Sequence, residues 1–149
     1  METLLAPLTG LSVSLDQVPD DVFSRKLLGD GVAILPTEGR LLSPADGEVI
    51  AVFHTGHAYC LRTGSGLELL IHVGLESISL KGEGFVSHVA PGDRVKAGDL
   101  LAQVDLTLLE SRGIPTVTPV VVCTAPASGT LHTHTGPVAA GETAIITIS

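Results

Sequence analysis

The sequence predicts an all-β protein, an antiparallel β-sandwich or barrel with one or two short helices. Three observations support this fold class. Glycine and proline are frequent, with 17 and 9 residues among 149, and they interrupt the chain at short intervals. The segments between them are short and rich in β-branched residues, which is typical of strands joined by tight turns. Two short motifs also occur twice, which favours a duplicated half-motif within one sandwich.

Strands are expected where short apolar runs lie between turn signals. In chain order these runs are Gly10–Val18, Val32–Leu35, Gly47–Phe53, Ala58–Arg62, Leu67–Val73, Leu100–Val104, Val117–Cys123 and Ala144–Ile148. One short helix is expected to begin at Pro19-Asp20-Asp21-Val22-Phe23. A second is expected over Leu106–Arg112, where Asp105 can cap the first turn and Gly113 can end the last.

The duplicated motifs lie far apart in the chain. Ser43–Val49 resembles Ala125–Leu131, and Val95–Asp99 resembles Val138–Glu142. The two pairs have different separations, so they do not form a repeat of one period. No linker or low-complexity stretch interrupts the chain, and we expect one domain over residues 1–149.

The composition excludes several classes of function. A net charge of −8 and few aromatic residues argue against nucleic-acid binding. No apolar run approaches the ~20 residues that span a bilayer, and the first residues lack the pattern of a signal peptide. We therefore expect a cytoplasmic protein without direct membrane insertion. Cys60 and Cys123 form no CxxC motif and are expected to be buried structural thiols.

The spacing of two histidines is the strongest indication of a site. His57 and His72 flank a Thr63-Gly64-Ser65-Gly66 turn signal. A turn centred on its middle pair places the histidines directly opposite each other on one face, with Cβ atoms ~5 Å apart. A slip of one residue would separate them onto opposite faces.

Paired imidazoles suggest metal, proton or phosphoryl chemistry; the alternative is a structural histidine beside an incidental neighbour. In this register the histidine face holds Tyr59, Leu61, Glu68 and Leu70, and the core face holds Ala58, Cys60, Leu67, Leu69 and Ile71.

Further motifs extend through most of the chain. They are Ala6-Pro7-Leu8-Thr9-Gly10, Val18-Pro19-Asp20-Asp21-Val22-Phe23, Gly29-Asp30-Gly31-Val32-Ala33-Ile34, Pro44-Ala45-Asp46-Gly47, His57-Ala58, Gly66-Leu67-Glu68-Leu69-Leu70-Ile71-His72-Val73-Gly74, Leu80-Lys81-Gly82-Glu83-Gly84-Phe85, the Gly92–Gly98 segment, Asp105-Leu106 and Thr118-Pro119-Val120-Val121. With these motifs the chain resembles the glucose-class enzyme IIA proteins of the bacterial sugar phosphotransferase system. The long matches around His72 and Lys81 are the specific ones.

The resemblance implies a phosphoryl carrier on an antiparallel β-sandwich. His72 matches the histidine that accepts phosphate from the carrier protein HPr and passes it to a IIB-domain cysteine of a membrane sugar permease. His57 matches the second histidine, which the family needs more for passing phosphate on than for receiving it, and Thr55 fits the supporting hydroxyl. The residues expected to contact partner proteins are Asp30, Val32, Phe53, Leu70 and Glu76.

The sequence departs from the family pattern at three positions. Leu70 stands where phenylalanine is expected, Glu76 where aspartate is expected, and Gly56 where asparagine is common. The family resemblance also allows regulatory targets, such as transporters and kinases.

Histidine suits this chemistry because neutral imidazole is a nucleophile and its ordinary pKa is ~6.5. The resemblance implies that His72 reacts through Nε2, and we expect a backbone carbonyl near Gly74 to accept a hydrogen bond from the other ring nitrogen. His57 and Thr55 are expected to donate hydrogen bonds to the bound phosphoryl group. No cofactor is expected beyond the covalent phosphohistidine, and any zinc at His57 and His72 would be incidental.

Two alternatives remain open. His132-Thr133-His134 offers two zinc ligands on one strand face, as in zinc hydrolases of a related sandwich fold. The residues needed to complete such a site are absent at the expected spacings, apart from Glu76 four residues after His72. A carrier domain with a modified lysine is the second alternative, but Leu80-Lys81-Gly82 lacks the usual context of that lysine.

Overall fold

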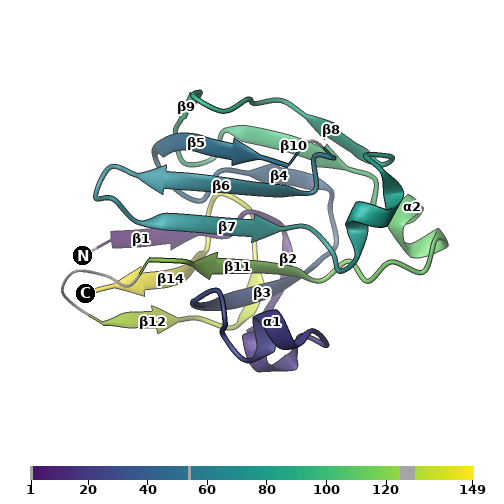
Figure 1. Cartoon of the computed structure of the whole chain (residues 1–149). Coiled ribbons are helices and arrows are strands. Elements are labelled where there is room, and N and C mark those ends of the chain that lie inside the picture. Colours follow the sequence, from purple (N-terminus) through teal and green to yellow (C-terminus); the bar gives the residue numbers. More distant parts are fainter. Residues whose placement is uncertain (1, 54, 125–129) are drawn as a thin grey trace.

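The computed structural model describes residues 2–53, 55–124 and 130–149 as three antiparallel sheets (Figure 1). The strands are β1 (Glu2–Leu5), β2 (Gly10–Ser14), β3 (Asp30–Pro36), β4 (Arg40–Leu42), β5 (Gly47–Val52), β6 (Ala58–Thr63), β7 (Glu68–His72), β8 (Phe85–Ser87), β9 (Arg94–Val95), β10 (Leu100–Val104), β11 (Thr118–Val122), β12 (Leu131–Thr133), β13 (Gly136–Val138) and β14 (Ala144–Ile148). The helices are the 3-10 turns η1 (Leu15–Gln17) and η2 (Ser77–Leu80) and the short α-helices α1 (Asp21–Ser24) and α2 (Leu106–Ser111). The predicted all-β sandwich is confirmed.

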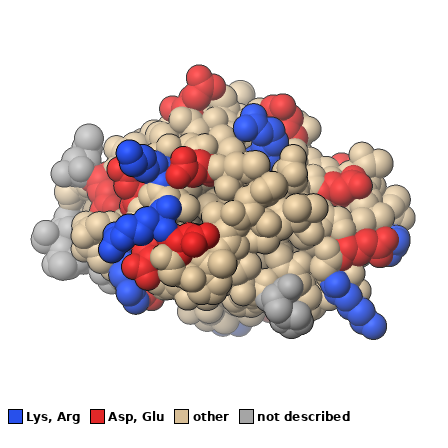
Figure 2. All heavy atoms as spheres, turned by 90° about the horizontal axis from the view of Figure 1, so that it is seen from above, with Lys and Arg blue, Asp and Glu red and all other residues tan. Residues whose placement is uncertain are grey.

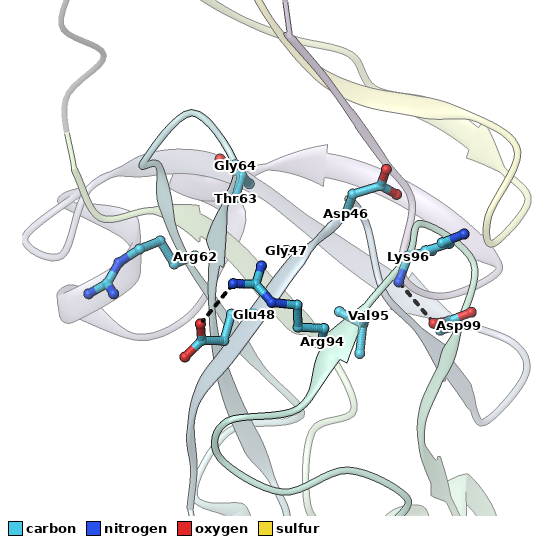
Figure 3. A pocket seen from close by; sticks show the side chains of 10 residues that line it. All are labelled: Asp46, Gly47, Glu48, Arg62, Thr63, Gly64, Arg94, Val95, Lys96 and Asp99. Atoms are coloured by element: carbon cyan, nitrogen blue, oxygen red, sulfur yellow. Dashed lines mark hydrogen bonds and ion pairs between the residues drawn. The ribbon is translucent and has the colours of Figure 1, made fainter.

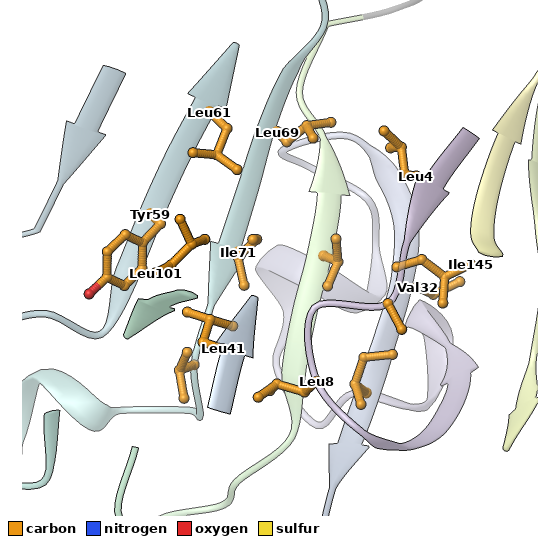
Figure 4. Packing of buried hydrophobic residues seen from close by; sticks show 14 of the residues in the cluster. Leu4, Leu8, Val32, Leu41, Tyr59, Leu61, Leu69, Ile71, Leu101 and Ile145 are labelled. Atoms are coloured by element: carbon orange, nitrogen blue, oxygen red, sulfur yellow. The ribbon is translucent and has the colours of Figure 1, made fainter. Parts of the chain in front are cut away.

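An eight-stranded sheet carries the order β13-β2-β3-β11-β7-β6-β5-β9, and two three-stranded sheets have the orders β1-β14-β12 and β4-β10-β8. Side chains from all three sheets meet in one buried core, which includes Leu4 of β1, Leu101 of β10 and Ile71 of β7 (Figure 4). A second, smaller buried cluster lies on the other face of the large sheet. There η1 and α1 contribute Leu15 and Phe23, which pack with residues of the sheet such as Leu70.

Both α-helices begin where the sequence predicts a helix, and the predicted Asp105 cap is confirmed. The Asp20 side chain accepts a hydrogen bond from the Val22 amide at the start of α1, and the Asp105 side chain accepts one from the Leu108 amide at the start of α2. Neither helix is long, and no helix in the described ranges is long and apolar enough to cross a membrane.

The duplicated Val-x-Ala-Gly motifs adopt the same local structure. Gly98 and Gly141 both have positive φ, at 92° and 75°, and each precedes a strand of a three-stranded sheet. The Gly98 amide donates to the Ser43 carbonyl, and the Gly141 amide donates to the Ala6 carbonyl, both at 2.9 Å. The two turns lie side by side, because a Cβ on Gly141 would come within 3.7 Å of the Gly98 Cα. The other predicted repeat falls largely on residues 125–129, which lie outside the described ranges.

The register of the β6–β7 hairpin differs from the prediction by one residue. Ala58, not His57, lies opposite His72. The reason is the turn: Thr63 pairs with Leu67 through a 2.9 Å backbone hydrogen bond, so three residues form the loop instead of two. Tyr59 and Leu61 therefore face the main core with Leu69 and Ile71, whereas Ala58 and Cys60 lie on the other face with Leu70.

The cysteine prediction is wrong for one of the two residues. Cys60 is half-buried against the smaller cluster, but Cys123 directly follows β11 and is exposed. Burial raises the pKa of the Cys60 thiol, and the Glu68 carboxylate raises it further. Both are free cysteines.

Tyr59 places a hydroxyl in the core without a hydrogen-bond partner among the described residues. Burial raises the pKa of Tyr59, and the nearby Ser87 hydroxyl opposes this shift, but it donates to the Val89 carbonyl at 2.8 Å and lies outside hydrogen-bonding geometry with the Tyr59 hydroxyl. A buried hydroxyl that loses its hydrogen bonds to water destabilises the folded state.

We therefore expect Tyr59→Phe to raise the free energy of unfolding by about 1 kcal/mol, measured by urea denaturation. Ser12→Ala is the matched control, because the buried Ser12 hydroxyl donates to the His134 carbonyl at 2.9 Å and its removal should be destabilising. Equal losses of stability in the two variants would show that the Tyr59 hydroxyl is satisfied in solution.

Candidate functional site

His72 ends β7, at the end of the strand that points toward α2 in Figure 1. Its Nδ1 lies 2.7 Å from the Gly74 carbonyl oxygen. A carbonyl only accepts, so Nδ1 carries the proton and Nε2 of the neutral ring keeps its lone pair. Gly74 is suited to this turn because its φ is +77° and a Cβ there would lie 2.9 Å from the Pro115 carbonyl oxygen. The predicted carbonyl partner near Gly74 is confirmed.

His57 lies beside His72 although the hairpin register does not pair them. The ring centroids are 5.0 Å apart and the ring planes meet at 77°. His57 directly precedes β6 and follows a turn in which Gly56 has a φ of +77°. The His57 side chain is therefore not bound to the alternating pattern of the strand. The His57 carbonyl accepts a 2.7 Å hydrogen bond from the Val73 amide, which ties the His57 backbone to the residue after His72. The prediction of adjacent rings is confirmed, but its geometric reason was wrong.

Thr55 is hydrogen-bonded through Oγ1 to His57 Nδ1, and both residues are buried. The exposed fraction of His57 is 2%, whereas His72 is half-buried. His72 is therefore the ring that a second protein can reach more readily, and His57 lies behind it with its orientation set by Thr55. This difference could not be read from the spacing of the two histidines.

All three phenylalanines of the chain contact the histidine pair. Phe23 of α1 lies 5.4 Å from the His72 ring, and Phe53 lies 5.4 Å from the His57 ring. Phe85 of β8 lies 6.4 Å from the His57 ring on another side. The rings exclude water from the pair, which lowers the local dielectric and strengthens electrostatic interactions there.

Burial lowers the pKa of His72 below its ordinary value. The hydrogen bond to Gly74 and the charge of Asp20 oppose this shift without cancelling it. A lowered pKa means that the neutral form of the ring predominates at neutral pH. Neutral His72, with its proton on Nδ1, is the form that can attack through Nε2.

We expect an NMR titration to give His72 a midpoint below the ~6.5 of an unperturbed imidazole. Asp20→Asn should move the midpoint further down, because it removes a negative charge that favours the protonated ring. Arg40→Gln, a change on β4 in a different sheet, serves as the control for a general charge effect. A midpoint at or above 6.5 would contradict the dominance of burial.

One acidic residue acts on the site in addition to the two that the sequence predicted. Asp20, whose charge reaches His72, was not selected from the sequence as a site residue, although its position as the N-cap of α1 was visible. Asp30 forms an ion pair with Lys26 at 3.2 Å. Glu76 is exposed and lies two residues beyond Gly74 in a left-handed conformation with φ +59°.

One residue predicted to contact partner proteins, Val32, is fully buried, and so is Tyr59, which was placed on the histidine face. Val32 and Tyr59 have exposed fractions of 0% and belong to the main core, so neither offers surface to a partner. Val32 points inward because β3 alternates its side chains, and Tyr59 does so because of the shifted hairpin register. Leu70 is also largely buried, in the smaller cluster. The exposed apolar residues on segments that carry the site are Val22, Leu27, Leu28, Phe53, Ile78 and Val86.

The predicted zinc ligands do not assemble. Among the described residues, no group of three or more His, Cys, Asp or Glu side chains could hold a metal ion. His132 and His134 are exposed on and after β12, where their Nε2 atoms lie 3.3 and 3.1 Å from the hydroxyls of Ser149 and Thr147.

A separate hollow of about 580 Å³ lies at the opposite end of β6 from His57 (Figure 3). Its charged side chains pair across neighbouring strands. Arg62 of β6 lies between Glu68 of β7 and Glu48 of β5, and it forms an ion pair of 3.0 Å with Glu68. On the other side of Glu48 lies Arg94 of β9, with an ion pair of 3.9 Å. On the face of the molecule shown in Figure 2, basic side chains likewise lie beside acidic ones. The hollow contains no histidine and no perturbed nucleophile, so the reactive chemistry belongs to the histidine pair.

Comparison with known proteins agrees with the geometry. Residues 2–128 match the family model for the phosphoenolpyruvate-dependent sugar phosphotransferase system, EIIA 1. The glucose-specific EIIA component of Bacillus cereus is 45% identical over 99% of this chain and 90% of its own length. The glucosamine-specific EIICBA component of Bacillus subtilis is 46% identical over 80% of this chain, which matches only 19% of that longer protein.

The fold has a close counterpart among solved structures. Glucose permease IIA from Mycoplasma capricolum superposes with a TM-score of 0.89 at 36% identity, covering 97% of this chain and 94% of that one. These matches give no support to the zinc hydrolase alternative. The chain belongs to the EIIA 1 family of the phosphoenolpyruvate-dependent sugar phosphotransferase system, and it is a phosphoryl-carrying phosphotransferase component of sugar transport.

Proposed function

We propose that His72 carries the phosphoryl group on Nε2, receiving it from phosphorylated HPr and delivering it to a IIB-domain cysteine of a sugar permease. The observation that carries this proposal is the 2.7 Å hydrogen bond from His72 Nδ1 to the Gly74 carbonyl. It fixes the tautomer whose lone pair is on Nε2. Burial keeps that ring neutral, and the neighbouring His57 supplies a second imidazole at 5.0 Å.

The transfer needs little covalent chemistry from the protein. The bond between phosphorus and the donor atom of HPr breaks as the bond to His72 Nε2 forms, and the proton stays on Nδ1, hydrogen-bonded to the Gly74 carbonyl. The ring becomes cationic when it bonds to phosphorus, and the Gly74 carbonyl and the Asp20 charge stabilise this cationic ring. On delivery, the bond from Nε2 breaks and the cysteine sulfur takes the phosphoryl group. His57 and Thr55 stabilise the phosphoryl oxygens. No metal ion enters either step, and any zinc bound by the histidine pair would be incidental.

The surface around the pair suits brief encounters with two partners. The exposed side chains of Phe53, Ile78 and Val86 provide apolar contact area, and the charges of Asp20 and Glu76 favour a basic partner. The net charge of −8 adds long-range steering toward such a partner. These features support HPr as the phosphoryl donor in the cytoplasm.

Fused relatives support a permease IIB domain as the acceptor. The glucosamine-specific relative from Bacillus subtilis and the N-acetylglucosamine-specific relative from Klebsiella pneumoniae are both EIICBA components, in which the matching segment is joined to further domains. Relatives named for glucose, glucosamine and N-acetylglucosamine share this sequence pattern. Sugar choice therefore belongs to the IIB and IIC partners in our proposal.

The proposal is tested by incubating the chain with HPr that carries a radiolabelled phosphoryl group. We expect uptake of a single acid-labile phosphoryl group, located on the peptide containing His72 by mass spectrometry. Addition of a purified IIB domain should then discharge the label. Label found on a different peptide, or no uptake, would refute the proposed role of His72.

A further inference from the structure

Backbone hydrogen bonds fix the chain that follows His72. The Val73 amide donates to the His57 carbonyl at 2.7 Å, and the Leu75 amide donates to the Pro115 carbonyl at 3.0 Å. Between these two anchors stands Gly74, whose carbonyl accepts from His72 Nδ1. The direction of that carbonyl depends on how the two peptide planes beside Gly74 are turned.

The plane between Val73 and Gly74 is held by a side chain. Ser77 has an exposed fraction of 0%, and its hydroxyl donates to the Val73 carbonyl at 2.6 Å. Val73 is itself completely buried, so this carbonyl has no access to solvent. Loss of the hydroxyl would favour rotation of the peptide toward another donor, since a buried carbonyl without a partner is costly.

We infer that Ser77 is a positioning residue for His72: its hydroxyl fixes the Val73–Gly74 peptide and thereby holds the Gly74 carbonyl against Nδ1. The inference rests on the proposed role of His72 as the phosphoryl acceptor. The Gly74 carbonyl belongs to the following peptide, which the Leu75–Pro115 hydrogen bond also anchors. Rotation of the Val73–Gly74 peptide shifts the Gly74 Cα and so weakens the contact of its carbonyl with Nδ1, and the neutral ring then also populates the tautomer with its proton on Nε2. That tautomer cannot attack phosphorus through Nε2.

The same hydroxyl also bears on His57. Val73 accepts a hydrogen bond from the Ser77 hydroxyl through its carbonyl, and it donates one to the His57 carbonyl through its amide. Ser77 is therefore connected through one residue to the backbone of both histidines. Partners of this kind, which orient a reacting group without touching the substrate, commonly change activity by about tenfold or more when removed.

The test compares Ser77→Ala and Ser77→Thr with Ser79→Ala. Ser79 is the matched control, because it lies in the same turn and its hydroxyl donates to the Glu76 carbonyl at 2.8 Å, but that bond does not hold Gly74. Imidazole ¹⁵N shifts of His72 in the folded, unphosphorylated protein report its tautomer. Phosphoryl uptake measured over a range of phosphorylated HPr concentrations reports the maximal rate and the KM.

We expect Ser77→Ala to shift the His72 ¹⁵N signals toward a mixture of tautomers and to slow uptake by about tenfold. Its KM for HPr should stay unchanged, Ser77→Thr should restore both readouts, and Ser79→Ala should leave both as in the parent chain. Unchanged ¹⁵N shifts in Ser77→Ala would overturn the inference, even if the variant is less stable. Because these shifts need no donor protein, they remain informative if the proposed acceptor role of His72 fails.

Discussion

Replacing His72 with alanine should reduce phosphoryl uptake from phosphorylated HPr by roughly 1,000-fold or more, because the attacking nitrogen is removed. His57 stays in place in this variant, but it is buried behind His72 and its Nδ1 is hydrogen-bonded to Thr55. We therefore do not expect His57 to take over as acceptor. Label incorporation over time, measured with the folded variant, checks this result.

The control for this experiment is His88→Ala. His88 is exposed, and its Nε2 lies 3.1 Å from the Gln103 side-chain oxygen, away from the histidine pair. This variant should take up phosphate as fast as the parent chain. The assignment is refuted if His72→Ala still incorporates label, and the responsible residue can then be found by mapping the labelled peptide.

The strands that the sequence predicted and those that it did not differ in their place in the sheets. All eight predicted strands lie inside a sheet, and the six others, β1, β4, β8, β9, β12 and β13, are the edges of the three sheets. An interior strand has neighbours on both sides and is buried, so its apolar run is long enough to recognise. An edge strand pairs on one side only. The edge strands here span two to four residues, too few for a periodic signal, and their positions depend on contacts with distant segments.

The site was predictable in its residues but not in its geometry. Glycine and serine marked the hairpin turn between the histidines, yet the loop takes in three residues, which moves every side chain of β6 to the other face. The histidines still meet, because the Gly56 turn lies outside the strand alternation. Val32 was predicted to contact a partner and Tyr59 to share the histidine face, but both side chains point into the main core.

The roles of Asp20 and Ser77 depend on tertiary contacts. Asp20 is far from His72 in sequence and comes near it only because α1 packs against the sheet, with Phe23 on the His72 ring. Ser77 acts through a backbone carbonyl, which leaves no mark in side-chain spacing.

Replacing His57 with glutamine should affect the two half-reactions unequally. During uptake the attacking group is the neutral His72 ring, so no negative nucleophile approaches the phosphoryl group. During delivery the acceptor is a cysteine thiolate, and its negative charge is repelled by the phosphoryl oxygens. A protonated His57 would offset this repulsion from its position 5.0 Å from the His72 ring. Glutamine can donate a hydrogen bond but cannot become cationic.

We therefore expect His57→Gln to take up phosphate within about threefold of the parent rate and to deliver it to the IIB domain about 100-fold more slowly. Single-turnover measurements of loading and of discharge separate the two steps. Thr55→Val is the companion variant, because it keeps His57 but removes the hydroxyl bonded to Nδ1, and we expect a smaller loss confined to delivery. If loading and discharge slow equally in His57→Gln, then His57 serves to hold the His72 ring in place and not to neutralise charge in the transfer to sulfur.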